Sequence, residues 1–150
     1  MVDVRGLQTP FVIVGGIATS LYMPQRNTLD LNILVLSAAA PALHAELAGR
    51  GHAQAGTLTT GGTSWRTPEG EILDVLESDE AWAIEALATP NRMSDGLPVI
   101  ALPYLVLMKL AASRAQDLAD VSRMLGIADS EALKSVRETV MRFRPSDSAD

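Results

Sequence analysis

Apolar residues first gather in a short run near the N-terminus. Residues 11–14 are all apolar, and the pair Gly15-Gly16 follows them directly. Residues 17–22 then mix apolar and polar positions up to Pro24. A β-branched run that ends in a glycine pair predicts a buried strand and a tight turn. A short helix should follow, and the proline should stop it.

Strict alternation of apolar and polar positions predicts a second strand over residues 29–35. Because successive side chains of a strand point to opposite faces, Asp30 and Asn32 are expected on one face. The other face carries the apolar residues Leu31, Ile33 and Val35. Two polar side chains therefore project side by side from this strand.

A third strand is predicted over residues 71–76, where Asp74 stands between apolar Leu73 and Val75. Alternation puts Asp74 on the face opposite to these two neighbours. A carboxylate among apolar residues needs a partner, which favours a functional site at Asp74 over a solvated surface position.

Turn-forming residues divide the middle of the chain. Ser37 is expected to cap a helix that runs to about residue 48, where glycines follow. A hairpin is predicted over residues 57–67, turning at Gly61-Gly62. Residues 78–80 should open another helix with acidic side chains in its first turn. Residues 97–101 are predicted to form a short strand at the sheet edge, where a proline is tolerated.

The C-terminal third has helical periodicity over residues 103–125 and 130–143, with a frayed tail over 144–150. In the first of these helices Arg114 falls on the arc of the apolar residues. A guanidinium on the core-facing stripe must be paired, and Asp117, one turn later, is the nearest candidate. Lys109 and Asp120 fall on a neighbouring arc.

The chain of 150 residues predicts one domain over residues 1–150. The expected fold class is α/β (α+β): a mixed β-sheet core at about residues 8–102, flanked by helices and covered by C-terminal helices over about 103–143. The absence of cysteine excludes disulfides, thiolate metal sites and cysteine nucleophiles. The two histidines, His44 and His52, are too few for a histidine-rich zinc site and are expected to face solvent.

The charge balance limits the classes of partner that the protein is expected to bind. Twelve Lys and Arg stand against 18 Asp and Glu, for a net charge of −6, and the basic residues form no run. This argues against an extended nucleic-acid surface, which needs broad phosphate neutralisation. The N-terminus lacks the pattern of a signal peptide, and no stretch approaches the roughly 18 apolar residues of a membrane span. We therefore expect a cytoplasmic protein without membrane contact.

Three segments in this order resemble the nucleotidyltransferase superfamily: Val14-Gly15-Gly16, the run from Arg26 through Thr28-Leu29-Asp30-Leu31-Asn32, and Leu73-Asp74-Val75. The helix with Lys109, then Arg114 and Asp117, extends the resemblance to the small bacterial branch that contains the AbiEii-type toxins. Each segment alone is common in proteins. Their order and spacing, over about residues 11–125, make the match moderately specific.

The resemblance implies a metal-dependent transfer of a nucleoside monophosphate from a nucleoside triphosphate to an acceptor. Such a transfer uses two Mg²⁺ or Mn²⁺ ions about 3.5–4 Å apart, which prefer hard oxygen ligands. By resemblance the metal ligands and catalytic residues are Asp30, Asn32 and Asp74. Nucleotide binding then falls to Gly15, Gly16, Arg26, Thr28 and Lys109. The acceptor, a protein hydroxyl, an RNA end or a small molecule, is not specified.

Asn32 departs from the family pattern, which has a second carboxylate at this position. An amide offers an oxygen ligand but no negative charge, so the repulsion between two divalent ions is less well offset. The site then works with weaker metal affinity, binds one ion and nucleotide without turnover, or serves only as a binding scaffold.

Ordinary structural interpretations stand beside these roles. Gly15-Gly16 is equally consistent with a plain strand-to-helix turn, and Asp30 with an exposed face or a helix cap. Lys109 is at least as consistent with a buried ion pair to Asp117 or Asp120 as with nucleotide contact, and Arg114 favours a structural role.

Three functional hypotheses therefore remain. The first is an active nucleotidyltransferase. The second is an inactive protein of the same fold that binds nucleotide or a protein partner. The third is the toxin of a toxin–antitoxin pair, with an antitoxin-like protein as its partner.

Overall fold

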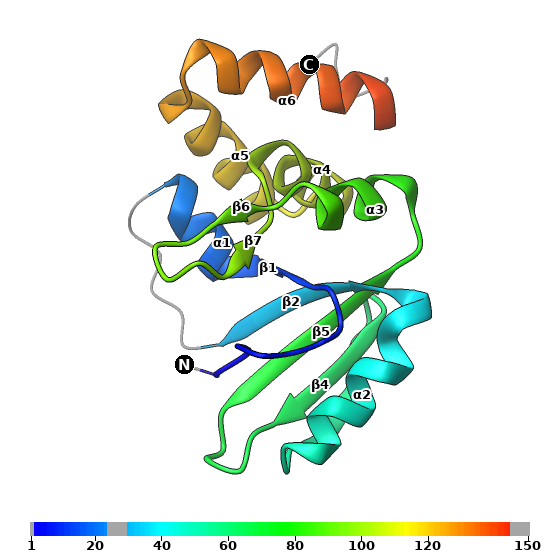
Figure 1. Cartoon of the computed structure of the whole chain (residues 1–150). Coiled ribbons are helices and arrows are strands. Elements are labelled where there is room, and N and C mark those ends of the chain that lie inside the picture. The colour runs from blue at the N-terminus through cyan, green and yellow to red at the C-terminus, as the bar shows by residue number, and fades with distance from the viewer. Residues whose placement is uncertain (1, 24–29, 145–150) are drawn as a thin grey trace.

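The structure is a computed structural model that describes residues 2–23 and 30–144 of the chain. The described strands form one mixed sheet in the order β3-β4-β5-β2-β1-β7-β6 (Figure 1). β2 pairs in parallel with β5, and β1 with β7, whereas the other neighbours are antiparallel. The strands are β1 (Val12–Val14), β2 (Leu31–Leu36), β3 (Ala53–Thr57), β4 (Gly62–Arg66), β5 (Ile72–Ser78), β6 (Asn91–Arg92) and β7 (Pro98–Val99).

Helices cover both faces of the sheet (Figure 1). One face carries α2 together with the N-terminal segment, and the other carries α1 and the helices from α3 onward. The helices are α1 (Gly15–Tyr22), α2 (Ala40–Gly49), α3 (Ala81–Ala88), α4 (Leu102–Ala112), α5 (Ala115–Ile127) and α6 (Ser130–Phe143), with a 3₁₀ turn η1 (Ser37–Ala39) before α2. Every described helix is too short or too polar to cross a bilayer.

The core lies on both sides of β2 and β5. Leu31, Ile33 and Val35 are fully buried on the face toward α2, and Leu43 and Leu47 of α2 are fully buried as well. Burying one such side chain contributes about 1.5–3 kcal/mol, so these central strands are the firmest part of the sheet.

The carboxylate of Glu46 links the N-terminal segment to α2 by hydrogen bonds. It accepts hydrogen bonds from the backbone N–H of Gln8 at 2.7 Å and of Thr9 at 2.8 Å, and from the Thr9 hydroxyl at 2.5 Å. Val2 and Val4 of the same segment are buried. The hydrogen bonds also lower the pKa of Glu46, because they outweigh the effect of its partial burial.

Several sequence predictions are confirmed: the mixed α/β class, the strand and helix around Gly15-Gly16, the hairpin before β5, and the final helix over residues 130–143. Others are wrong. The helix predicted over 103–125 is two helices, because Ser113 adopts a left-handed conformation with φ of 56° and Arg114 begins a new helix. Ser37 starts η1 and makes no capping hydrogen bond, so α2 begins three residues later.

Two further predictions are wrong because long-range pairing decides them. The strand at 97–101 is reduced to β7, and it is not the edge, since β6 pairs outside it. His44 does not face solvent freely. Its Nε2 lies 3.2 Å from the Thr63 hydroxyl, and its ring packs against Trp65 with centroids 5.3 Å apart. His52 is half-buried, and its Nδ1 is enclosed.

Candidate functional site

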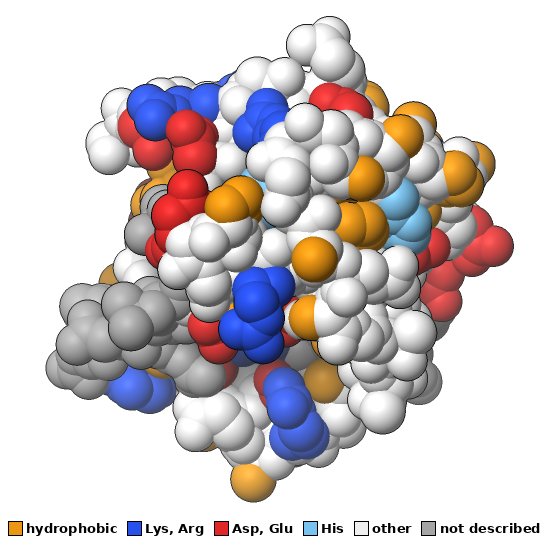
Figure 2. Space-filling model, turned by 90° about the horizontal axis from the view of Figure 1, so that it is seen from below, with side chains coloured by type: hydrophobic (Ala, Val, Ile, Leu, Met, Phe, Trp, Pro, Cys, Tyr) orange, Lys and Arg blue, Asp and Glu red, His pale blue; other side chains and the backbone are white. Residues whose placement is uncertain are grey.

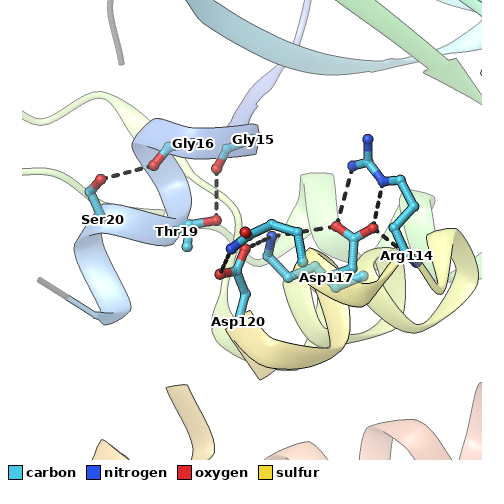
Figure 3. A network of polar contacts seen from close by, with 9 residues as sticks. Gly15, Gly16, Thr19, Ser20, Arg114, Asp117 and Asp120 are labelled. Atoms are coloured by element: carbon cyan, nitrogen blue, oxygen red, sulfur yellow. Dashed lines mark hydrogen bonds and ion pairs between the residues drawn. The ribbon is translucent and has the colours of Figure 1, made fainter. Parts of the chain in front are cut away.

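The connection from β1 to α1 forms an open helix N-terminus. Gly15 begins α1 with φ of 71°, in the left-handed region that favours glycine. The residue before it, Val14, supplies no capping side chain, and the N–H groups at such a helix N-terminus favour an anion. The Thr19 and Ser20 hydroxyls donate to the carbonyls of Gly15 and Gly16, at 3.0 and 2.9 Å (Figure 3). These bonds hold the first turn in shape.

Asn32 lies directly against this turn. A Cβ placed on Gly15 would come within 2.5 Å of the Asn32 amide nitrogen and 3.0 Å of its Cβ. In the sheet register, Asn32 pairs with Val14 on one side and with Asp74 on the other. The amide therefore stands between the glycine turn and the carboxylate of β5.

Burial identifies the face on which Asp74 lies. Its neighbours Leu73 and Val75 are fully buried toward α2, so Asp74 points to the opposite face, where it is half-buried. This is also the face of Asn32, because directly paired residues of neighbouring strands share a face. Asp30, two residues before Asn32, is exposed just before β2 begins. The alternation predicted from the sequence for Asp30, Asn32 and Asp74 is compatible with one shared site.

Arg26 and Thr28, which the resemblance assigns to the nucleotide, lie outside the described residues, as does Pro24. The same holds for residues 145–150 of the predicted tail.

Lys109 is buried and forms ion pairs with Asp117 and Asp120, the two carboxylates labelled on α5 in Figure 3. Its Nζ lies 2.9 Å from Asp120 Oδ2 and 3.8 Å from Asp117 Oδ1. The amide of Gln116 donates to the other Asp120 oxygen at 2.7 Å. The structural interpretation of Lys109 thus has direct geometric support, whereas its contact with a nucleotide stays a prediction.

The prediction that Arg114 pairs with Asp117 is confirmed, but the prediction that Arg114 faces the core is wrong. Its side chain is 77% exposed, because the break at Ser113 ends the helical periodicity. Its backbone N–H, Nε and Nη2 all donate to the Asp117 carboxylate, with Nε at 2.7 Å. Burial alone would raise the pKa of Asp117. The bonds and charge of Arg114, with Lys109 nearby, outweigh burial and lower that pKa.

The donor set at Asp30, Asn32 and Asp74 suits a hard cation only in part. Carboxylate and amide oxygens are the ligands that Mg²⁺ prefers. Within residues 2–23 and 30–144, however, no three His, Cys, Asp or Glu side chains gather as a metal-ligand set. Two carboxylates and one amide therefore fit one divalent ion better than two.

Two cavities lie away from this cluster. One of about 340 Å³ is lined by Arg5, Arg92 and Pro98, among others. Another of about 430 Å³ is lined by Tyr22, Met124 and others at the far end of α1. Neither cavity is lined by Gly15, Asn32 or Asp74, each of which is half-buried.

Ser64 and Arg66 of β4 also lie near Asp74, although they are not among the site residues predicted from the sequence. Ser64 pairs directly with Asp74, and Arg66 with Ile72. The intervening Trp65 is buried toward α2, so Ser64 and Arg66 share the face of Asp74. The alternation of Thr63 and Trp65 with Ser64 and Arg66 was a usable signal, but the pairing of β4 with β5 was needed to place them.

Charged side chains are scattered over the underside of the molecule. Figure 2 shows Lys and Arg on this face in separate groups, with Asp and Glu among them. The visible face offers no continuous basic track that a long polyanion would follow.

Comparison with solved structures identifies proteins of the same fold. The solution structure of the antibiotic-resistance factor ANT(2'')-Ia superposes with a TM-score of 0.57 and 14% identity, covering 92% of this chain and 84% of that one. The crystal structure of ANT(2'')-Ia with adenylyl-2''-tobramycin gives 0.57 and 15%, covering 89% and 88%. Lincomycin-bound LnuA, a lincosamide antibiotic adenylyltransferase, gives 0.50 and 13%, covering 79% and 87%.

Models of known protein families and curated protein sequences give no match to the chain. The structural likeness therefore establishes a nucleotidyltransferase fold, at identities too low to carry substrate or activity across.

Proposed function

We propose that the chain is a nucleotidyltransferase that moves a nucleoside monophosphate from a nucleoside triphosphate to an acceptor hydroxyl. One observation carries the proposal: the uncapped Gly15-Gly16 helix start, Asn32 and Asp74 stand in a row on adjacent strands. The fold shared with adenylyltransferases supports it.

The row suggests how the substrates are arranged. The N–H groups and positive end of the α1 dipole attract the triphosphate at Gly15-Gly16. The acceptor oxygen and the leaving pyrophosphate lie roughly in line across the α-phosphorus. The acceptor then approaches from the opposite side of the row, over β5 and β4.

The transfer balances without further reactants. The acceptor hydroxyl oxygen forms a bond to the α-phosphorus, and the bond from that phosphorus to the bridging oxygen of the β-phosphate breaks. The electron pair leaves with pyrophosphate, and the hydroxyl proton passes to the Asp74 carboxylate, the acidic group on the acceptor side.

Asp30 and Asp74 would hold a Mg²⁺ or Mn²⁺ ion, with the Asn32 oxygen as a weaker ligand. When bound, the ion neutralises charge that develops on the phosphate oxygens. The kinship with AbiEii-type toxins and an antitoxin-like partner stay predictions.

A second candidate function is nucleotide binding without turnover, and Asn32 favours it. Replacing a carboxylate by an amide removes one negative charge from a place where cations must approach closely. The same scaffold would then bind nucleotide, or a protein partner, as a regulatory element.

Thermal unfolding with each of ATP, GTP, CTP and UTP, with and without Mg²⁺, tests binding first. Free ligand at 100 times its Kd adds about 2.7 kcal/mol of stability, which moves the Tm of a domain of this size by several degrees. Asp74→Asn should remove the metal-dependent part of the shift. Asp79→Asn is the matched control, because Asp79 is an exposed aspartate outside the row.

Pyrophosphate release with tobramycin, lincomycin and simple hydroxyl compounds then separates the two candidates. An active enzyme should release pyrophosphate in the wild type, and faster in Asn32→Asp. Binding without release in both proteins would favour the second candidate. The absence of any nucleotide-dependent shift would contradict both nucleotide-based proposals.

A further inference from the structure

Arg66 is a cationic residue beside the proposed site to which the proposed function assigns no role. It is exposed at the end of β4, and its side chain has no hydrogen bond or ion pair with another residue that the structure describes. The other arginines near the sheet differ in this respect. Arg50, for example, donates to the backbone oxygens of Asp3 and Arg5, and Arg92 donates to that of Gly96.

The strand register places Arg66 on the acceptor side. Reading across the sheet, Val14, Asn32, Asp74 and Ser64 form one row, and Arg66 lies two residues beyond Ser64 on the same face. The Asp74 carboxylate therefore stands between the glycine turn and Arg66. Neighbouring strands lie about 4.8 Å apart, so Arg66 is three strand spacings away from β1.

The side chains near Arg66 on β4 and β3 are small, whereas its partner on β5 is the half-buried Ile72. Ser64 is half-buried, and Gly56, its partner on β3, carries no side chain. Ala53 pairs with Arg66 from the same edge strand and is exposed. A molecule resting on β4 would thus meet a hydroxyl, a flat backbone and one guanidinium.

We infer that the acceptor carries an anionic group, a phosphate or a carboxylate, which Arg66 binds while the acceptor hydroxyl faces Asp74. This inference rests on the proposed function and names its acceptor class. A guanidinium binds both kinds of anion through two parallel N–H bonds, which fixes orientation as well as affinity. A single guanidinium can bind one such group, and the net charge of −6 disfavours a long polyanion.

Matched acceptor pairs test the inference. Pyrophosphate release is measured with glucose 6-phosphate against glucose, with gluconate against sorbitol, and with tobramycin as a cationic compound. The anionic member of each pair should react at lower KM. Arg66→Gln should raise that KM about 10- to 100-fold, with kcat and the neutral compounds little changed, and Arg66→Lys should recover part of the loss.

A binding measurement tests the anion site at Arg66 without requiring catalytic turnover. In NMR spectra, the Nε–Hε signal of Arg66 should shift on addition of glucose 6-phosphate or gluconate and stay still with glucose or sorbitol. Arg137→Gln is the matched control, because Arg137 is an exposed arginine on α6, far along the chain from this face. That variant should leave binding and KM unchanged.

The outcomes separate the two proposals. Nucleotide-dependent stabilisation without any anion effect at Arg66, or a preference for neutral or cationic acceptors, would overturn this inference alone. Loss of nucleotide stabilisation in Arg66→Gln would also overturn it, because Arg66 would then hold the triphosphate. An anion shift at Arg66 with no nucleotide effect under any condition would refute the nucleotidyltransferase and the acceptor role together.

Discussion

Two constraints meet at Gly15. The residue has φ of 71°, and its Cα faces the Asn32 side chain so closely that a Cβ would lie 2.5 Å from the amide nitrogen. Either constraint alone disfavours any other residue. The Asn32 side chain therefore packs against the Gly15 turn, so this contact as well as any ligand constrains the residue at position 32.

Gly15→Ala is therefore expected to lower stability by more than about 1 kcal/mol, the usual cost of a left-handed alanine, since the contact with Asn32 adds to it. It should also abolish the nucleotide-dependent rise in Tm, because the helix start must shift. Chemical denaturation measures the first effect and thermal unfolding with nucleotide the second.

Gly126→Ala supplies the comparison. Gly126 lies inside α5 with open space where a Cβ would stand, so alanine there should stabilise by about 0.5–1 kcal/mol. Equal stability of Gly15→Ala and the wild type would show that the turn is not constrained as described.

At the scale of single elements, α5 depends on the carboxylate of Asp117. This side chain is almost fully buried and accepts from the backbone and side chain of Arg114 at the start of the helix. An acidic group in the first turn also interacts favourably with the positive end of the helix dipole. The junction after Ser113 is thus held by one ionised group.

The depressed pKa of Asp117 gives a stability contribution with a defined sign. Burial alone would raise this pKa, but the Arg114 bonds and charge lower it below its unfolded value near 4. The contribution is complete above that unfolded value and is lost as pH falls through the folded pKa. The Tm difference between wild type and Asp117→Asn should hold from pH 7 to about 5 and shrink below pH 4.

Glu138→Gln provides the control for this titration. Glu138 forms an exposed ion pair with Lys134 at 4.0 Å, and such pairs contribute little. The Tm difference between Glu138→Gln and the wild type should stay small over the whole pH range of the titration. A difference for Asp117→Asn that persists unchanged to pH 3 would mean that packing, not ionisation, holds the start of α5.

The elements also show what the sequence can predict. The helix over residues 130–143 was predicted correctly because its periodicity is strong, and the Asp129 side chain accepts from Ala132 N at 2.8 Å to cap it. The break at Ser113 was not predictable, since serine gives no sign of a left-handed conformation. β6 was missed because two residues carry no periodicity and pair only through β7.

For the site, alternation alone predicted that Asp30 and Asn32 share a face and that Asp74 faces away from its apolar neighbours. The contact of Asn32 with Gly15 depends on register and on the angle at which α1 leaves β1. The place of Arg66 relative to Asn32 depends on the pairing of β5 with β2, which lies far from β4 and β5 in sequence. Local patterns contain none of this long-range information.

At the scale of the whole molecule, the sheet is firm in the middle and weak at both edges. β2 pairs with β5 over its full length and with β1 over residues 32–34, and its central residues are fully buried. β3 is exposed at every residue and pairs only with β4, and β6 is two residues long. The proposed site lies on the central strands, where groups are held most rigidly, and Arg66 lies toward the weaker edge.

Native-state hydrogen exchange should reproduce this gradient. The amides of β2 and β5 should exchange only through global unfolding, because their bonds open only when the core is lost. Amides on β6 and on the outer edge of β3 should exchange faster by several orders of magnitude, through local opening or direct contact with solvent. Protection of the outer β3 amides equal to that of β2 would contradict the gradient. It would mean that another chain covers this uncharged edge.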